Sequence, residues 1–280
     1  MANNSNENVE NNNSSDNSND KVDTDESEPS VSETSLGLTG NVIGEYADEN
    51  ISISLQQFTV NETEVYVADV TVSSAKYLKT ALADGTYGKN IKAKTSEMSS
   101  ENNAILAING DYYGTRERGY VIRNGVLYRD SQDDSDVLVI YADGSFEIVS
   151  AYDVTAEELV AKGAWQAFSF GPALVEDSQV TVGVNEETGR AKASNPRTAI
   201  GIIDDLHYVF VVSDGRTNES AGLSLYELGC FMQELGVTTA YNLDGGGSST
   251  MVFQDQVINN PTSSGNSIKE RSVSDIVYIG

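Results

Sequence analysis

Short runs of β-forming residues recur along this chain, and they constrain its fold more than any other feature. Each run has the length and apolar content of a strand. Two of them contain turn signals, Ala142-Asp143-Gly144-Ser145 and Asp204-Asp205, which are typical of antiparallel hairpins. The runs cover Ile51–Val60, Glu64–Val72, Ala104–Asn109, Val137–Ile148, Arg197–Ser213, Thr238–Leu243, Thr250–Phe253 and Asp275–Ile279.

Helices are fewer but have clear start signals. Thr155-x-x-Glu158 and Ser224-x-x-Glu227 are capping boxes, and apolar residues at helical spacing follow the second as far as Gly236. Two further helices are predicted over Ala75–Ala83 and Thr95–Asn102. Because strands outnumber helices and do not alternate with them, we expect an α+β fold with a mostly antiparallel or mixed sheet core and a few flanking helices.

The first 40 residues differ in composition from the rest. They are rich in Asn, Ser and acidic residues and contain few apolar side chains. We therefore expect residues 1–40 to form a disordered acidic tail and residues 41–280 to form a single domain. No signal peptide opens the sequence, but a long polar tether suits an extracellular or cell-surface protein whose signal is absent from the given sequence. A cytoplasmic location stays open.

Charge and composition exclude several classes of protein. The chain has 280 residues with 17 Lys and Arg against 43 Asp and Glu, a net charge of −26. This charge argues against a partner that is nucleic acid or an anionic membrane, and no stretch is apolar enough to span a bilayer. One Cys and one His cannot form a disulfide framework or a typical structural zinc site within one chain.

The strongest chemical motif is the glycine-rich segment Tyr241–Thr250. Three successive glycines, Gly245, Gly246 and Gly247, exceed what a tight turn needs and indicate a close backbone approach to a ligand. Exposed amides beside the Ser248 and Ser249 hydroxyls would suit an anionic oxygen, and Asn242 and Asp244 alternate onto one face of the preceding strand. A glycine bulge at a barrel corner is the alternative.

Arginines stand at three other strand ends or loops. Arg197, followed by Thr198, opens one strand, Arg216 follows its hairpin partner, and Arg271 lies in a loop before the last strand. A guanidinium group grips phosphate or carboxylate through two hydrogen bonds, so the set predicts an anion site in an otherwise acidic protein. An arginine of this kind, taken alone, more often forms a surface ion pair.

A fourth motif, Ala107–Gly114, runs from a strand into a glycine turn. It places Asn109, Asp111 and Tyr113 close together, and sugar sites commonly combine an amide, a carboxylate and an aromatic ring. A turn in which Asn and Asp cap their own backbone competes with this interpretation. The polar stretch Asn185–Asn195 is either a lid over the site or a long hairpin loop.

Taken together, these motifs resemble the phosphodiester glycosidase family. The resemblance spans Ala104 to the C-terminus. It is carried by Asn109-Gly110-Asp111-Tyr112-Tyr113, Asn195-Pro196-Arg197-Thr198-Ala199, Asp214-Gly215-Arg216, Gly222-Leu223-Ser224-Leu225-x-Glu227-Leu228, Asn242-Leu243-Asp244-Gly245-Gly246-Gly247-Ser248-Ser249 and Glu270-Arg271.

The resemblance implies hydrolysis of the sugar C1–O bond of a glycosyl-1-phosphodiester, such as an α-N-acetylglucosamine-1-phosphate diester on a surface polymer or glycan. Asp214, Asp244 or Asp111 would supply the catalytic carboxylate. Binding of phosphate and sugar would fall to Arg197, Arg216, Arg271, Asn109, Tyr113, Thr198, Asn242, Gly245, Gly246, Gly247, Ser248 and Ser249. No cofactor is expected, and a divalent cation stays open. A phosphodiesterase that breaks the P–O bond and a non-catalytic polysaccharide-binding module are the alternatives.

Overall fold

The computed structural model describes residues 31–33, 38–186, 194–263 and 267–280, and antiparallel sheets dominate it. The largest sheet has nine strands in the order β1-β2-β3-β4-β15-β14-β16-β12-β13. Its strands are β1 (Val31–Glu33), β2 (Thr39–Ala47), β3 (Ile51–Val60), β4 (Thr63–Val72), β12 (Ala173–Glu176), β13 (Gln179–Val180), β14 (Arg197–Asp204), β15 (His207–Ser213) and β16 (Thr239–Asn242).

Two five-stranded sheets complete the β structure. The first, in the order β18-β17-β6-β19-β5, contains β5 (Leu78–Leu82), β6 (Leu106–Asn109), β17 (Met251–Phe253), β18 (Gln256–Val257) and β19 (Asp275–Ile279). The second, in the order β10-β9-β11-β7-β8, contains β7 (Val121–Arg123), β8 (Val126–Arg129), β9 (Asp136–Tyr141), β10 (Phe146–Ser150) and β11 (Ala164–Phe168).

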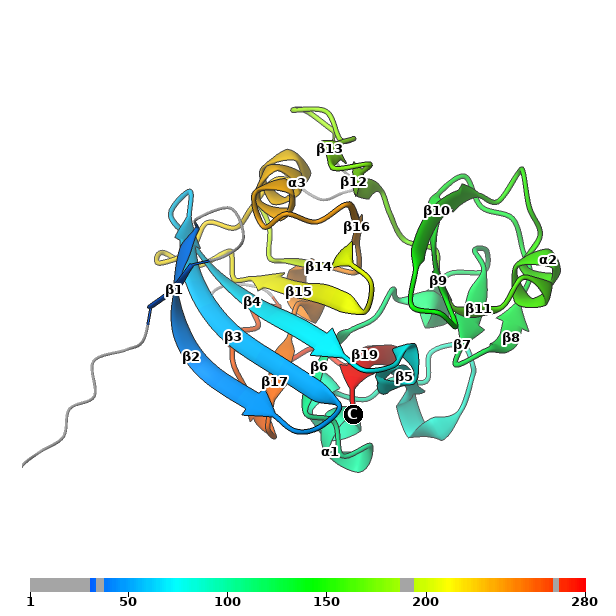
Figure 1. Cartoon of the computed structure of the whole chain (residues 1–280), viewed down its shortest axis with the longest axis horizontal. Coiled ribbons are helices and arrows are strands. Elements are labelled where there is room, and N and C mark those ends of the chain that lie inside the picture. The colour runs from blue at the N-terminus through cyan, green and yellow to red at the C-terminus, as the bar shows by residue number, and fades with distance from the viewer. Residues whose placement is uncertain (1–30, 34–37, 187–193, 264–266) are drawn as a thin grey trace, which may run out of the picture.

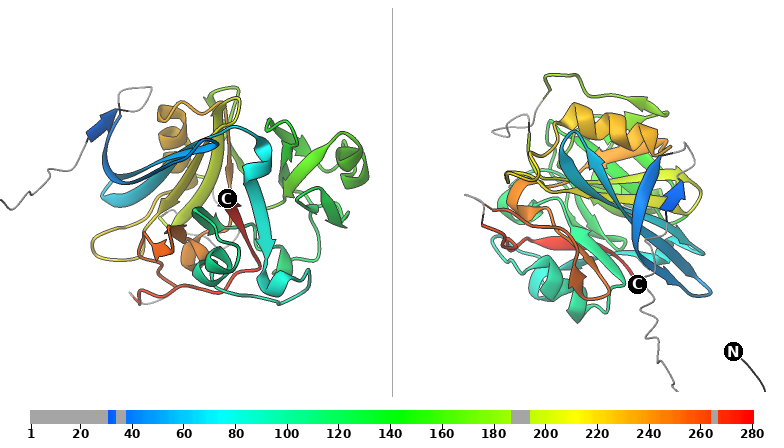
Figure 2. Two further views of the ribbon diagram at one scale, coloured as in Figure 1. Left: turned by 60° about the horizontal axis from the view of Figure 1, so that its bottom comes forward. Right: turned by 90° about the vertical axis from the view of Figure 1, so that its left-hand side faces the viewer.

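Three α-helices cover the outer faces of these sheets. Helix α3 (Leu225–Glu234) lies on the nine-stranded sheet, α1 (Thr95–Glu101) on the sheet that contains β6 and β19, and α2 (Ala156–Ala161) on the third sheet (Figures 1 and 2). The largest apolar cluster includes Leu55 and Phe210 of the nine-stranded sheet and Ile108 of the sheet that contains β6 and β19, and it extends to Ile140 of the third sheet. The central part is therefore a helix, two packed sheets and a second helix, with the third sheet beside them (Figure 1).

The predicted fold class is confirmed, and most predicted elements are found. Strands β3 and β19 have the predicted bounds, and both hairpin turns join antiparallel neighbours. The Thr155 and Ser224 hydroxyls accept the amides of Glu158 and Glu227, as the capping boxes predict. The helix predicted at Thr95–Asn102 is α1.

The helix predicted over Ala75–Ala83 is wrong. A single 3₁₀ turn (Ala75–Tyr77) leads into strand β5, which pairs with β19 along its whole length. Leu78, Lys79 and Ala81 favour a helix locally, but pairing with the last strand of the chain overrides this weak propensity. No local signal reports that partner, which lies about two hundred residues further along the chain.

The structure describes only part of the sequence around the predicted boundary between the tail and the domain. Strand β1 and the first residues of β2 lie within the predicted tail, and residues 1–30 and 34–37 fall outside the described residues. The predicted lid or hairpin at Asn185–Asn195 also lies largely outside them. No helix of the described part is long and apolar enough to cross a bilayer.

Candidate active site

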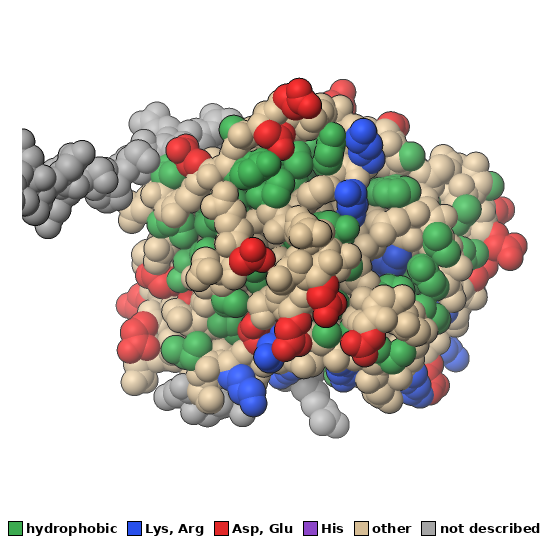
Figure 3. Space-filling model, turned by 90° about the horizontal axis from the view of Figure 1, so that it is seen from below, with side chains coloured by type: hydrophobic (Ala, Val, Ile, Leu, Met, Phe, Trp, Pro, Cys, Tyr) green, Lys and Arg blue, Asp and Glu red, His purple; other side chains and the backbone are tan. Residues whose placement is uncertain are grey.

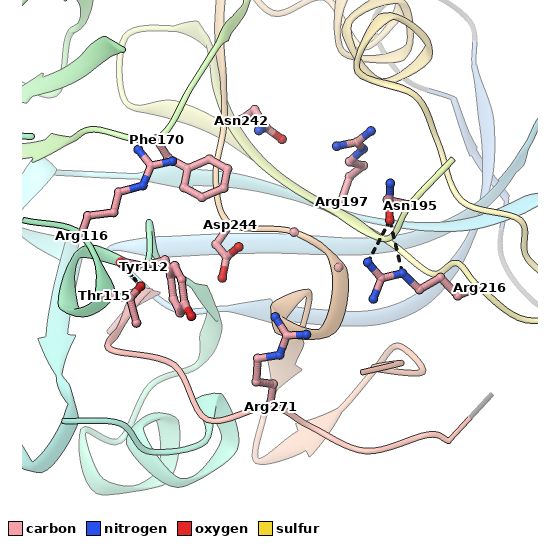
Figure 4. Close-up of a pocket in the computed structure, with 12 residues that line it drawn as sticks. Tyr112, Thr115, Arg116, Phe170, Asn195, Arg197, Arg216, Asn242, Asp244 and Arg271 are labelled. Atoms are coloured by element: carbon pink, nitrogen blue, oxygen red, sulfur yellow. Dashed lines mark hydrogen bonds between the residues drawn. The ribbon is translucent and has the colours of Figure 1, made fainter. Parts of the chain in front are cut away.

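A cavity of about 840 Å³ lies at the ends of strands of the nine-stranded sheet and of the sheet that contains β6 and β19. Its residues come from the turn after β6, the loop after β11, the start of β14, the loop after β15, the end of β16 and the loop before β19 (Figure 4). The lining residues are Tyr112, Thr115, Arg116, Phe170, Asn195, Arg197, Arg216, Asn242, Asp244, Gly245, Gly246 and Arg271. Seven of these belong to the predicted site.

Asp244 lies in the middle of the cavity (Figure 4). The rings of Tyr112 and Phe170 lie on one side of it, and the side chains of Arg197, Arg216 and Arg271 lie on the other. The residue is only 9% exposed, and its Oδ2 has no hydrogen bond to any described residue. Burial raises the pKa of Asp244 to about 6, while the Ser248 hydroxyl and the charges of Arg271 and Arg116 act in the opposite direction. The carboxyl group therefore changes its charge near neutral pH.

Arg197, Arg216 and Arg271 gather on one side of Asp244 (Figure 4). Arg216 Nη2 and Nε donate to Asn195 Oδ1 at 2.9 and 3.2 Å, and Arg197 Nε donates to the Leu223 carbonyl at 2.8 Å. Burial lowers the pKa of Arg216, and the charges of Arg271 and Arg197 lower it further. Mutual repulsion of this kind is relieved when an anion binds, so the cluster is suited to a phosphate group.

The glycine run is explained by what packs against it. A Cβ atom on Gly246 would lie 2.9 Å from Arg216 Nη2, and one on Gly247 would lie 2.5 Å from Arg271 Nη2. A Cβ on Gly245 would lie 2.9 Å from the Pro196 carbonyl oxygen. The three glycines thus allow two guanidinium groups and a neighbouring loop to approach the backbone.

The predicted nest of backbone amides needs a correction. The Gly246 amide donates to the Pro196 carbonyl at 2.8 Å, and the Ser248 amide donates to the Gly245 carbonyl at 3.3 Å. Both donors are therefore used within the protein. Gly245 and Gly246 line the cavity beside the guanidinium groups, but the Gly246 amide already donates within the protein.

Asn109, Thr198 and Ser249 lie beneath the cavity instead of lining it, and all three are fully buried. Asn109 Nδ2 donates to the Asp244 carbonyl at 2.6 Å, and Thr198 Oγ1 donates to Asn109 Oδ1 at 2.9 Å. Thr198 Oγ1 also lies 3.2 Å from Ser249 Oγ. These side chains join β6, β14 and the glycine loop, so they fix the position of Asp244 through its backbone.

Asn242 lines the cavity as predicted, at the end of β16. Its Nδ2 donates to the Gly171 carbonyl at 2.8 Å, which orients the side chain. Its buried Oδ1 has no hydrogen-bond partner among the described residues. Asn242 therefore presents an acceptor that suits a hydroxyl or amide donor of a ligand.

The structure places Asp111 and Tyr113 outside the lining residues. Asp111 Oδ1 lies 2.8 Å from Arg123 Nη2, and Arg123 Nε lies 2.8 Å from Asp275 Oδ2, with all three residues buried. Asp111 Oδ2 also accepts the Ser169 amide at 3.1 Å. This buried cluster ties the turn after β6 to β7, β11 and β19, and Tyr113 packs beside it with Arg123 over its ring at 5.7 Å.

Asp214 also lies outside the lining residues and is 2% exposed. Its Oδ1 accepts the Asn260 amide at 2.8 Å and Asn259 Nδ2 at 3.2 Å, and its Oδ2 accepts Asn260 Nδ2 at 3.1 Å. Burial raises the pKa of Asp214, against these hydrogen bonds. The contacts bind Asp214 to the loop after β18, so Asp244 is the one predicted carboxylate that the described lining residues contain.

Five lining residues were not among the predicted site residues: Tyr112, Thr115, Arg116, Phe170 and Asn195, the last of which opens one of the motifs that carry the family resemblance. Tyr112 has a φ of +66°, an unusual backbone conformation for a bulky side chain, which turns the chain after β6. Arg116 stacks on the Phe170 ring at 4.6 Å. Tyr112 lies inside a motif that the sequence already marks, and Arg116 follows it closely. Nothing local distinguishes Phe170.

Among the residues that the structure describes, no three His, Cys, Asp or Glu side chains are grouped so that they could hold a metal ion. His207 lies away from the cavity, with Nε2 2.7 Å from Asp69 Oδ1. On the face shown in Figure 3, acidic and basic side chains are interspersed and form no broad basic area. The arginine-lined cavity thus belongs to a chain whose net charge is −26.

Comparisons with known proteins relate the chain to one family and to individual proteins. The sequence model of the phosphodiester glycosidase family matches residues 102–280. An uncharacterized SPbeta prophage-derived protein, YomE, of Bacillus subtilis (strain 168) is 31% identical over 182 residues, 62% of this chain and 28% of that protein. Mouse N-acetylglucosamine-1-phosphodiester α-N-acetylglucosaminidase is 32% identical over 97 residues, 33% of this chain and 19% of that enzyme. The chain thus spans less than a third of these relatives' lengths.

Among solved structures, the catalytic domain of the zebrafish N-acetylglucosamine-1-phosphodiester α-N-acetylglucosaminidase is similar with a TM-score of 0.66. The match covers 85% of this chain and 86% of that one at 20% identity. At this identity the likeness concerns the fold.

Proposed function

This chain belongs to the phosphodiester glycosidase family, and from that premise we propose that it hydrolyses the bond between C1 of a sugar and the oxygen of a phosphodiester. The observation that carries the proposal is the arrangement of the cavity. Three arginines lie on one side of the buried Asp244, and two aromatic rings lie on the other (Figure 4). A phosphate and a sugar bound on these two sides would have their shared bond beside Asp244.

The arginine side suits a phosphate that leaves as a monoester. Negative charge on this group increases as the C1–O bond breaks, and guanidinium groups fixed in advance stabilise that charge best. A phosphate oxygen also leaves far more readily than an alkoxide. The reaction therefore makes little demand for a strong general acid, which agrees with a single acidic side chain among the described residues that line the cavity.

Asp244 would act on the sugar carbon in its ionised form. With a pKa of about 6, the Asp244 side chain is mostly ionised at pH 7. A buried carboxylate next to C1 stabilises an oxocarbenium-like carbon strongly. The same carboxylate could attack C1 or activate a water molecule. The charges of Arg271 and Arg116 lower the pKa of Asp244 and so increase its ionised fraction.

The other side suits a sugar ring. The Tyr112 and Phe170 rings offer apolar faces for its C–H groups, and Asn242 Oδ1 offers an acceptor for a hydroxyl or amide. A glycosyl-1-phosphodiester of a surface polymer or glycan is the substrate class that we propose. Because the mouse relative is named for N-acetylglucosamine-1-phosphodiesters, such a diester is the first compound to test.

Product analysis tests this function. The protein is incubated with an α-N-acetylglucosamine-1-phospho-sugar diester, with and without chelator, and followed by ³¹P and ¹H NMR. We expect free sugar and a phosphomonoester on the other partner, and no reaction with Asp244→Asn. A sugar 1-phosphate would mean P–O cleavage and thus a phosphodiesterase, whereas binding without turnover of any diester would favour a polysaccharide-binding module.

A further inference from the structure

The cavity holds more positive charge than a phosphodiester needs. Four of the eight arginines in this acidic chain line it, against Asp244 as the single acidic residue among the described lining residues. A phosphodiester carries one negative charge. The excess positive charge favours a substrate that carries a second anionic group.

Arg116 is the arginine that lies apart from the others. In Figure 4 it stands beside Phe170, across Asp244 from Arg197, Arg216 and Arg271. It therefore borders the side of the cavity where the proposed function places the sugar. A phosphate bound among the other three arginines would leave Arg116 to the glycosyl group.

The Arg116 guanidinium is held in place, yet most of its donors are not used. Nη1 donates to the Ser169 carbonyl at 3.1 Å, and the group stacks on the Phe170 ring at 4.6 Å. Asp133 lies 3.8 Å from Nη1, too far for a hydrogen bond, so it offsets part of the charge without occupying the fork. Nε and Nη2 have no hydrogen-bond partner among the described residues. A fixed planar fork with free donors is suited to an oxyanion.

Neighbouring charges define how far an anion can extend. Lys92 Nζ lies 5.0 Å from the centre of the Tyr112 ring and adds positive charge near the same side. Beyond Phe170, a second cavity of about 320 Å³ is lined by Asp134, Asp136 and Glu186, which would repel an anion. The second anionic group therefore belongs on the sugar itself, not on a unit that continues past Phe170.

We propose that Arg116 is a specificity-determining residue that binds an oxyanion substituent of the sugar, so that the preferred substrate is the phosphodiester of an acidic sugar. The substituent is a carboxylate, as in a uronic acid, or an ester phosphate. This inference rests on the proposed function, because that function assigns the sugar to this side of Asp244.

Binding measurements can test the inference without turnover. Isothermal titration calorimetry compares glucose 1-phosphate with glucuronic acid 1-phosphate and with glucose 1,6-bisphosphate. We expect at least one of the two acidic compounds to bind roughly tenfold or more tightly than glucose 1-phosphate, as a charge-assisted fork of hydrogen bonds would give. Which compound gains affinity identifies the substituent.

The variant Arg116→Met keeps an unbranched side chain against Phe170 and removes the fork. In this variant we expect glucuronic acid 1-phosphate and glucose 1,6-bisphosphate to bind about as tightly as glucose 1-phosphate does. Arg116→Lys, which keeps the charge but not the planar fork, should retain only part of the preference. Melting curves of both variants show that they are folded.

The matched variant Arg271→Met separates this inference from the proposed function. It should weaken binding of all three compounds by a similar factor and leave the ratio unchanged. If Arg271→Met weakens none of them, the proposed phosphate site is wrong. Equal affinities of the wild-type protein for all three compounds, or a preference that survives Arg116→Met, would overturn the role of Arg116.

Discussion

The variant Asp244→Asn should make the protein more stable at neutral pH while it abolishes turnover. Burial raises the pKa of Asp244 from 3.8 to about 6, so the folded state holds the proton more tightly than the unfolded chain does. Stability from this group is fully present below about pH 3.8 and is lost as the pH rises through about 6. At pH 8 the ionised carboxylate therefore destabilises the folded state.

The size of the effect follows from the two pKa values. At about 1.4 kcal/mol per pKa unit, the difference between 3.8 and about 6 corresponds to roughly 3 kcal/mol at pH 8. At pH 5 the unfolded chain is mostly ionised but the folded protein is not, and about half of the effect remains. Asn has the shape of Asp and no charge, so it should recover most of this free energy at each pH.

Urea unfolding of both proteins at pH 5 and pH 8, followed by Trp165 and tyrosine fluorescence, measures the difference. We expect Asp244→Asn to be the more stable protein at both pH values, with the larger gain at pH 8. Gain of stability with loss of activity is the pattern of a strained catalytic group. A variant less stable than the wild type at pH 8, or a difference that does not depend on pH, would refute this reasoning.

Three further predictions concern the residues around Asp244. Arg271→Met should reduce kcat/KM for a sugar phosphodiester at least tenfold more than for a neutral aryl glycoside, because Arg271 is proposed to contact only phosphate; equal losses would contradict that role. Arg123→Met should lower the free energy of unfolding by about 3–5 kcal/mol in urea titrations, since Asp111 and Asp275 would stay buried without their partner, whereas the exposed Arg118→Met should change it by less than about 0.5 kcal/mol. Gly247→Ala should weaken binding of glucose 1-phosphate in calorimetry, because its Cβ would lie 2.5 Å from Arg271 Nη2 and displace that group. Gly183→Ala, where a Cβ would have no neighbour closer than 3.8 Å, is the control. Equal affinities of the two variants would argue against the glycine loop as the surface that positions Arg271.

Local signals identified much of the fold and about half of the cavity. The capping boxes and hairpin turns act over a few residues, so they could be read directly from the chain. The same holds for Gly245–Gly247, where three glycines in succession indicate a close approach, although the groups that approach are guanidinium groups of this protein. Arg197, Arg216 and Arg271 are distinguished by their places at strand ends or in a loop of an acidic chain that has only eight arginines.

The roles of the carboxylates depended on distant partners. Asp111 and Asp244 both follow a strand that ends in a glycine turn, and their local patterns are alike. Asp111 pairs with Arg123, which in turn contacts Asp275 at the far end of the chain, and this places Asp111 in a buried cluster. Such pairings arise from the packing of sheets, so spacing along the sequence could not separate a structural aspartate from one that lines the cavity.

The most direct test of the central claim is the position of solvent oxygen in the products. Hydrolysis of an α-N-acetylglucosamine-1-phosphodiester is run in H₂¹⁸O, and ³¹P NMR and mass spectrometry locate the label. The account predicts ¹⁸O at C1 of the released sugar and none in the phosphomonoester, because Asp244 acts at the sugar carbon. Label in the phosphate would mean attack at phosphorus and would contradict the account.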